Sequence, residues 1–144
     1  RLGNRHALDE YISGICREES IGVAYCDITG LKKLNDTKGH EAGDRMIVSA
    51  CNCLLRVFQG FGLFRVGGDE LLVLCPGIRE EDFGNKIKDL HKDMKEHDVT
   101  MAVGAAWKEN MTMGFDSILS ESEKLMYHEK AVYYGSGKMD RRSR

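Results

Sequence analysis

A glycine pair between two short apolar runs is the feature that most restricts the fold of this chain. Residues 62–66 and 71–74 are typical of buried strands, and Gly67 and Gly68 stand between them. Glycine adopts the positive φ angles of tight hairpins without a steric penalty. The two runs are therefore predicted to form a β-hairpin, which imposes antiparallel pairing on the sheet that contains it.

The rest of the chain alternates between helical periodicity and short apolar runs. Apolar residues recur with the spacing of one helix face over residues 5–17, 41–58, 80–96 and 117–133. Further strands are predicted over residues 21–26 and 101–107, with a polar loop or short helix over residues 29–40. The order helix, strand, helix, hairpin, helix, strand, helix predicts an α+β or α/β fold in which helices cover a central sheet.

Length and charge restrict the class of protein further. The 144 residues suit one globular domain with a real core. The formal net charge of -2 gives no overall basic field for a nucleic acid or a membrane surface. No apolar run approaches the roughly 20 residues of a membrane span, and no signal peptide opens the chain. We therefore expect no nucleic-acid partner and no membrane contact by this domain.

The five cysteines are scattered and odd in number, which makes a poor disulfide framework. Cys51 and Cys53 are two apart in a helical pattern and so point to different faces, and a zinc site would need a second pair or histidines. We expect reduced thiols in a cytosolic domain and no structural metal. Four histidines are expected on the surface: His6, His91, His97 and His128.

Acidic residues stand at two places where a core residue would be unfavourable. Asp27 follows the apolar run 21–26, and Asp69 and Glu70 follow the glycine pair. A carboxylate there must be solvated, paired or bound to a cation. If that run lies beside the hairpin, Asp27 and Asp69 meet at one rim, where a few carboxylates and substrate phosphates suit Mg²⁺. The alternative is a solvated turn, because Gly-Gly-Asp is good turn chemistry by itself.

The segment after Asp27 carries groups suited to a nucleotide. Backbone amides in the bend Thr29-Gly30-Leu31, with Lys32, can hold phosphate oxygens beside a metal. Asn35 and Asp44 can together read a purine, because a carboxylate accepts from the N1–H and 2-amino groups of guanine. The alternative is that Asn35 is a loop residue and Asp44 an early-helix acid favoured by the helix dipole.

Several stretches together resemble the GGDEF family of diguanylate cyclases. Residues 27–44 (DITGLKKLNDTKGHEAGD) resemble the first long motif of the family, and residues 65–71 (RVGGDEL) resemble its signature. Asn4-Arg5 is similar to the end of the opening motif, and residues 122–130 are similar to the closing helix. The resemblance implies a central five-stranded, mainly antiparallel sheet flanked by helices, like the palm of nucleotidyl cyclases and polymerases. It also implies a single domain, residues 1–144, taken from a longer multidomain signalling protein.

The resemblance implies a role for each matching residue. The divalent ions, Mg²⁺ or Mn²⁺, would be bound by Asp27, the Ile28 carbonyl, Asp69 and Glu70. The catalytic residues would be Asp27, Asp69 and Glu70, with Glu70 either beside the metal or accepting the 3′-hydroxyl proton. Guanine would be recognised by Asn35 and Asp44. The β- and γ-phosphates of GTP would be held by Lys32, Lys130 and the amides of Gly30 and Leu31.

The implied activity is the condensation of two GTP molecules into cyclic di-GMP and two pyrophosphates. One domain holds one GTP, so we expect a transient homodimer with twofold symmetry. The alternative is a catalytically degenerate GGDEF module that binds GTP and acts as a regulatory domain. We expect a covalently linked upstream sensory domain. We also expect this domain to lie in the cytoplasm, whether the full-length protein is soluble or anchored in a membrane.

The chain departs from the family pattern at several positions. Leu71 replaces the phenylalanine of the signature, and Thr29 replaces an acid or asparagine that is often found there. Tyr134 stands where the family often has a phosphate-binding arginine. That contact is either absent or made by one of three later residues: Lys138, Arg141 or Arg142.

The family's product-inhibition motif, Arg-x-x-Asp before the signature, is also incomplete. Arg56 lacks the matching aspartate, and Phe58 and Phe61 occupy the expected register. We therefore predict no product-inhibition site of the usual kind.

Overall fold

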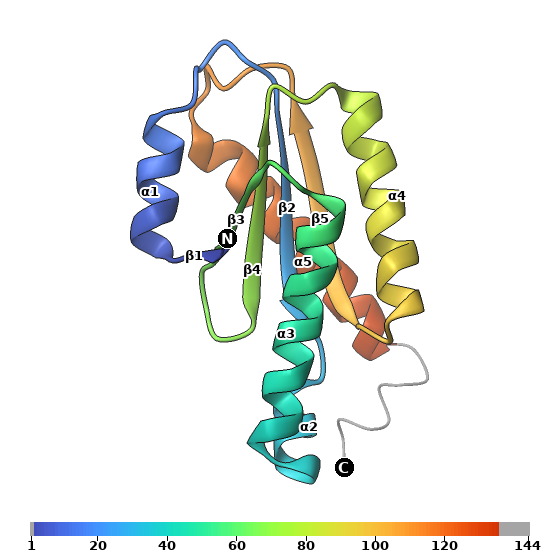
Figure 1. The fold of residues 1–144 in the computed structure, drawn as a ribbon. Coiled ribbons are helices and arrows are strands. Elements are labelled where there is room, and N and C mark those ends of the chain that lie inside the picture. The colour runs from blue at the N-terminus through green and yellow to red at the C-terminus, as the bar shows by residue number, and fades with distance from the viewer. Residues whose placement is uncertain (1, 136–144) are drawn as a thin grey trace.

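The computed structural model describes residues 2–135, which form one sheet with helices on both faces (Figure 1). The sheet has five strands in the order β1-β3-β4-β2-β5. Their bounds are β1 Leu2–Gly3, β2 Ile21–Ile28, β3 Gly62–Arg65, β4 Glu70–Pro76 and β5 Met101–Lys108. The short β1 pairs in parallel with β3, and all other pairings are antiparallel. The predicted mainly antiparallel fold is confirmed, with four longer strands and a two-residue fifth.

Of the five helices in the described residues, four bury one face against the sheet, and the short second helix packs mainly against the third. Their bounds are α1 Arg5–Ser13, α2 Leu31–Lys38, α3 His40–Val57, α4 Glu80–Glu96 and α5 Phe115–Gly135. One core lies between the sheet and α3 and α4, and includes Leu54 and Leu90. The other lies under α1 and α5, and includes Leu8 and Met126. Among the described residues, no helix combines the length and the apolar character needed to cross a membrane.

The central strand β2 decides which core each of its side chains enters. All eight of its residues are buried. Alternate residues face opposite sides of a strand, so Cys26 packs toward α3 and α4 and Tyr25 packs toward α1 and α5. Asp27 shares the side of Tyr25, and its carboxylate therefore points toward α5.

The observed boundaries correct several predicted ones. The first helix ends at Ser13 rather than at residue 17, because the Gly14 backbone N–H caps it by donating to the carbonyls of Tyr11 and Ile12. The 21–26 strand continues to Ile28, since Asp27 pairs with β4 on one side and with β5 on the other. Asp27 is thus inside a strand rather than after one. The sequence did not predict β1, and α5 is longer at both ends than residues 117–133.

Helix α5 lies unusually close to β5 at Gly104. A Cβ atom at this position would overlap the Ser122 carbonyl oxygen and the Met126 backbone nitrogen, and would lie 2.9 Å from the Met126 Cα. Only a residue without a side chain permits this approach. It brings the C-terminal half of α5, including Lys130, over the end of the sheet that carries Asp27.

Candidate metal and nucleotide site

Three carboxylates converge where β2 meets the hairpin between β3 and β4. Oxygen atoms of Asp27, Asp69 and Glu70 all lie within 4.8 Å of one another. The turn is fixed to the end of β2, because the Ile28 N–H donates to the Asp69 carbonyl at 2.9 Å. Glu70 also pairs with Asp27 across the strands. The structure therefore brings together the acidic residues that the sequence placed on separate elements.

Asp27 is the buried member of this group, with 2% of its surface exposed. The Lys130 ammonium donates to Oδ2 at 3.2 Å, while Oδ1 is buried without a hydrogen-bond partner among the described residues. Burial raises the pKa of Asp27, the negative charge of Asp69 raises it further, and Lys130 opposes both effects. A buried carboxylate oxygen without a donor, beside two more carboxylates, has the chemistry of a cation ligand.

Tyr25 fixes one oxygen of Glu70. Its hydroxyl donates to Oε1 at 2.9 Å, and the residue is 6% exposed. Burial, followed by this hydrogen bond to Glu70, raises the pKa of Tyr25, so the hydroxyl stays protonated and remains a donor. The sequence analysis missed this contact. The alternation of β2, which puts residues 25 and 27 on one side, was the available signal.

The donor set fits a hard divalent cation. Carboxylate and carbonyl oxygens are the ligands of Mg²⁺ and Mn²⁺, and Mg²⁺ is bound by few carboxylates together with phosphates. Asp27, Asp69 and Glu70 supply the carboxylates, and Ile28 follows Asp27 directly with its carbonyl. The unpaired Asp27 Oδ1 is the structural observation that supports this fit.

The bend between β2 and α2 presents the first turn of a helix beside these acids. Gly30 adopts a left-handed φ of 76° as the residue before α2. Thr29 is held in place because its N–H and hydroxyl both donate to the Thr100 carbonyl, at 3.2 and 3.3 Å. Leu31 is buried and Lys32 is exposed. The amides predicted to hold phosphate are thus at a helix N-terminus, where anions are favoured.

The two residues predicted to recognise guanine lie on adjacent helices. Asn35 is on α2, and its Oδ1 is buried without a hydrogen-bond partner among the residues described. Asp44 is exposed on α3 and lines a shallow hollow of about 430 Å³. The amide of Asn35 lies against Gly43, the neighbour of Asp44 in the chain. The structure therefore places both residues at the corner between α2 and α3.

Lys130, predicted as a phosphate ligand, makes an ion pair with Asp27 in this structure. Its side chain is 32% exposed, so the ammonium lies at the border of the cluster formed by Asp27, Asp69 and Glu70. The candidates for the missing arginine contact, Lys138, Arg141 and Arg142, lie outside the described residues, and the side chain of Tyr134 is not described either.

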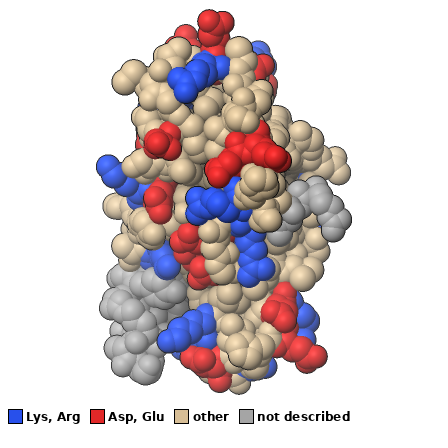
Figure 2. Space-filling model, turned by 90° about the vertical axis from the view of Figure 1, so that its left-hand side faces the viewer, with Lys and Arg blue, Asp and Glu red and all other residues tan. Residues whose placement is uncertain are grey.

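Charged groups of both signs are interspersed on the face that carries α1. Figure 2 shows Lys and Arg side chains lying among Asp and Glu side chains there rather than in one patch. The charges visible on this face therefore do not add up to a field of one sign.

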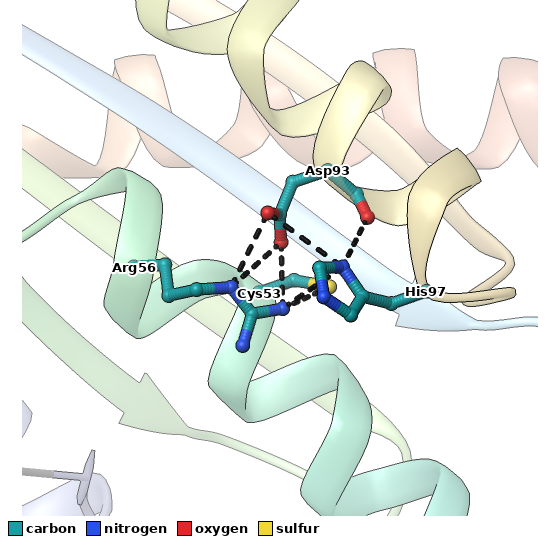
Figure 3. Close-up of polar contacts among 4 residues, drawn as sticks. All are labelled: Cys53, Arg56, Asp93 and His97. Atoms are coloured by element: carbon teal, nitrogen blue, oxygen red, sulfur yellow. Dashed lines mark hydrogen bonds and ion pairs between the residues drawn. The ribbon is translucent and has the colours of Figure 1, made fainter.

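A second group of ligand-type atoms joins α3 to α4 (Figure 3). Atoms of Cys53, Asp93 and His97 lie within 4.8 Å of one another. The Arg56 Nη2 is among them, 2.8 Å from Asp93 Oδ2, 3.2 Å from His97 Nδ1 and 3.5 Å from Cys53 Sγ. The sequence predicted His97 as a surface residue; it is exposed, yet its ring contacts both Asp93 and Arg56.

In this second group the charges are paired between protein side chains, and we interpret it as an ion-pair cluster rather than a metal site. Burial raises the pKa of the Cys53 thiol to about 12, which keeps it protonated and a weak metal ligand. The hydrogen bond from Arg56 lowers the pKa of Asp93. The guanidinium lies where a bound ion would have to be. Arg56, which the sequence analysis considered for product inhibition, thus has its acidic partner on α4 instead of in an Arg-x-x-Asp motif.

The comparisons with known proteins agree with the fold and the motifs. The family described as "Diguanylate cyclase, GGDEF domain" matches residues 1–133, and the chain belongs to this family. The diguanylate cyclase DgcS of Shewanella oneidensis is 25% identical over 142 residues, which is 90% of this chain and 47% of that protein. The cyclic di-GMP phosphodiesterase PdeB of the same organism is 36% identical over 77 residues, 51% of this chain and 9% of that protein.

Solved structures show the same fold. The GGDEF domain of DgcB from Caulobacter crescentus, in complex with c-di-GMP, superposes with a TM-score of 0.79 over 90% of this chain and 85% of that one. The sequence identity is 22%, so this likeness concerns the fold. The chain spans less than half the length of the two curated relatives named above.

Proposed function

We propose that this domain is a diguanylate cyclase that condenses two GTP molecules into cyclic di-GMP with release of two pyrophosphates. The observation that carries the proposal is the cluster of Asp27, Asp69 and Glu70 beside the N-terminus of α2. Asp27 is its buried member, and its Oδ1 has no hydrogen-bond donor among the described residues. Membership of the GGDEF family and the likeness to DgcS support the same activity.

The residues of the chain then have distinct tasks. Asp27, Asp69, Glu70 and the Ile28 carbonyl would hold Mg²⁺ or Mn²⁺, which would lower the pKa of the attacking hydroxyl and neutralise charge on the leaving group. Glu70, oriented by Tyr25, accepts the proton of the ribose 3′-hydroxyl. Because Tyr25 bonds to Oε1, the other Glu70 oxygen is the one available for either the metal or this proton.

Phosphate binding follows from the bend and from α5. The amides of Gly30 and Leu31 donate to the β- and γ-phosphates at the start of α2, with Lys32 nearby. Lys130 is the second cation, and an arriving phosphate competes with Asp27 for its ammonium. Positioning and electrostatic stabilisation supply most of the rate enhancement, as in phosphoryl transfer generally.

Base selection falls to the corner between α2 and α3. Asp44 accepts from the N1–H and 2-amino groups of guanine, which adenine does not present together. Asn35 contributes an amide from the facing helix. The pair thereby distinguishes GTP from ATP.

The complete reaction needs two copies of the domain. The 3′-oxygen of each GTP attacks the α-phosphorus of the other, a new P–O bond forms and the bond to pyrophosphate breaks. One domain holds one GTP, so a transient homodimer with twofold symmetry assembles the site. We propose that a covalently linked upstream domain controls this pairing in the cytoplasm.

A second candidate function is a degenerate GGDEF module that binds GTP and regulates a partner. Two observations favour it: Lys130 is paired with Asp27, and the Thr29 hydroxyl is bonded to Thr100 rather than turned to the acids. A segment similar to this chain also occurs within PdeB, which is named as a phosphodiesterase.

The deciding experiment is product analysis by mass spectrometry. The domain, as isolated and fused to a dimerising coiled coil, is incubated with GTP and Mg²⁺ or Mn²⁺, beside an Asp69→Ala control of each form. Asp69 lies on the turn before β4 and is only half-buried, so the variant should keep its fold. Cyclic di-GMP from the wild type alone supports the cyclase. GTP binding without product in the fused dimer would establish the degenerate module.

A further inference from the structure

Gly43 lies against the head of the Asn35 side chain. A Cβ atom at Gly43 would overlap the Asn35 Oδ1 and would lie 2.7 Å from its Cγ and 3.1 Å from its Nδ2. Gly43 is buried in the first turns of α3, and its φ is not positive. The helix backbone does not need a glycine here. The absence of a side chain at this position instead leaves room for the amide of Asn35.

The corner between α2 and α3 holds this arrangement in place. Gly39, with a φ of 89°, joins the two helices, and its N–H donates to the Asn35 carbonyl at 2.9 Å. The Gly43 N–H then points back to the Gly39 carbonyl at 3.4 Å. The backbone on either side of the Asn35 amide is therefore fixed, and Gly43 forms the wall that the amide packs against.

Folding alone does not account for an asparagine at this wall. Its Oδ1 is buried and has no hydrogen-bond partner among the described residues, which is unfavourable for a polar atom. Of the three amide-head atoms, Nδ2 lies farthest from Gly43. The packing thus holds the oxygen against the helix and leaves the amide nitrogen, a donor, on the side away from it.

We propose that Gly43 is a positioning residue for base selectivity, which acts by seating the Asn35 amide with Nδ2 toward the nucleotide. The inference rests on the proposed GTP-binding function. An N–H donor matches the O6 acceptor of guanine and faces the 6-amino donor of adenine unfavourably. Asp44, next in the chain, accepts from the N1–H and 2-amino donors of the same base. One turn of α3 therefore organises both contacts.

A methyl group at position 43 displaces the amide without breaking the fold. The atoms that it would meet belong to the end of a flexible side chain, in contrast to Gly104, where they belong to the backbone. Gly84 offers a matched control, because it is an exposed glycine inside α4 and a Cβ there would meet nothing within 4 Å. Alanine favours the helix at both positions.

The first measurement is binding of the α,β-methylene analogues of GTP and ATP, which cannot cyclise, by calorimetry with Mg²⁺. The variants are Gly43→Ala, Asn35→Ala, the double variant and Gly84→Ala. Gly43→Ala should weaken binding of the GTP analogue by roughly three- to tenfold, the loss of one hydrogen bond, and should not weaken binding of the ATP analogue. Asn35→Ala should give the same loss, and the double variant no more than either, because both changes remove one contact. Additive losses, or unchanged selectivity in Gly43→Ala, would overturn the proposal.

The second measurement does not depend on nucleotide binding. The side-chain amide resonances of Asn35, assigned by their absence in Asn35→Ala, should move in Gly43→Ala and stay in place in Gly84→Ala. If the resonances do not move in Gly43→Ala, Gly43 does not position the Asn35 amide, and the proposal is refuted. If the wild type binds neither analogue, the proposed function fails together with the selectivity role, while moved resonances still establish that Gly43 seats Asn35.

Discussion

Replacing Lys130 by methionine tests whether the carboxylate group is organised around positive charge. The substitution keeps a long flexible side chain but removes the ammonium that donates to Asp27 at 3.2 Å. Asp27, 2% exposed and close to Asp69 and Glu70, would then lose its partner. The folded state without a metal should become less stable.

The expected loss is about 1–2 kcal/mol in the free energy of unfolding at neutral pH. Removing one partner of a fully buried ion pair costs roughly 3–5 kcal/mol. Two features of this pair reduce that value. Lys130 is 32% exposed, so solvent screens the interaction. Asp27 already has a raised pKa, and it can take up a proton when its partner is lost, which limits the penalty.

Urea unfolding followed by circular dichroism, with and without millimolar Mg²⁺, measures both parts of the prediction. A ligand that binds only the folded state stabilises it in proportion to its affinity. Mg²⁺ should therefore restore more stability to Lys130→Met than to Lys124→Met, an exposed control on the same helix. Equal gains from Mg²⁺ in the two variants, or no loss in the metal-free state, would refute the reasoning.

Three further predictions concern the base pocket, the ion-pair cluster and the packing of α5. Asp44→Ser should lower the GTP-over-ATP preference in binding by roughly tenfold, the value of a charge-assisted hydrogen bond; an unchanged ratio removes Asp44 from the pocket. Asp93→Asn should destabilise the fold at neutral pH. The lowered pKa of Asp93 stabilises the folded state above the ordinary value of 3.8, and this is lost as pH falls through the lowered pKa. Urea midpoints of variant and wild type should therefore converge in acid; a constant difference contradicts the pairing with Arg56. Gly104→Ala should cost about 3 kcal/mol or more, because it strikes the Met126 backbone; a melting temperature near that of the wild type would contradict the close approach.

Local patterns were sufficient for most of the elements. The predicted helix over residues 80–96 matches α4 at both ends. The glycine pair lies at the turn of the observed hairpin. What periodicity could not predict depends on partners elsewhere in the chain. Strand β2 includes Asp27 because both neighbouring strands pair with it, and β1 exists because β3 offers a free edge.

The candidate site was predictable by residue type but not by contact. The motifs named Asp27, Asp69 and Glu70, and the structure brings these three together. No sequence motif indicates the roles of the Tyr25 hydroxyl and of the missing side chain at Gly43. Both roles depend on the side chain that each residue contacts, Glu70 for Tyr25 and Asn35 for Gly43. The Arg56 cluster was missed for the same reason, since Asp93 and His97 are 37 and 41 residues away from Arg56 in the chain.

The electrostatics of the carboxylate site depend on how α5 packs against β5, the edge strand next to β2. Asp27 is tolerable in a buried strand because Lys130 reaches it, and Lys130 reaches it because α5 lies directly on β5. That approach requires Gly104, since any side chain there would strike the α5 backbone. Gly104 pairs with Tyr25 in the ladder, so the same register that brings α5 down also fixes the strand that presents the hydroxyl to Glu70. A substitution at Gly104 should therefore loosen the pair between Lys130 and Asp27. It should lower the stability of the metal-free protein and, as in Lys130→Met, raise its Mg²⁺ affinity, although the residue contacts none of the three carboxylates.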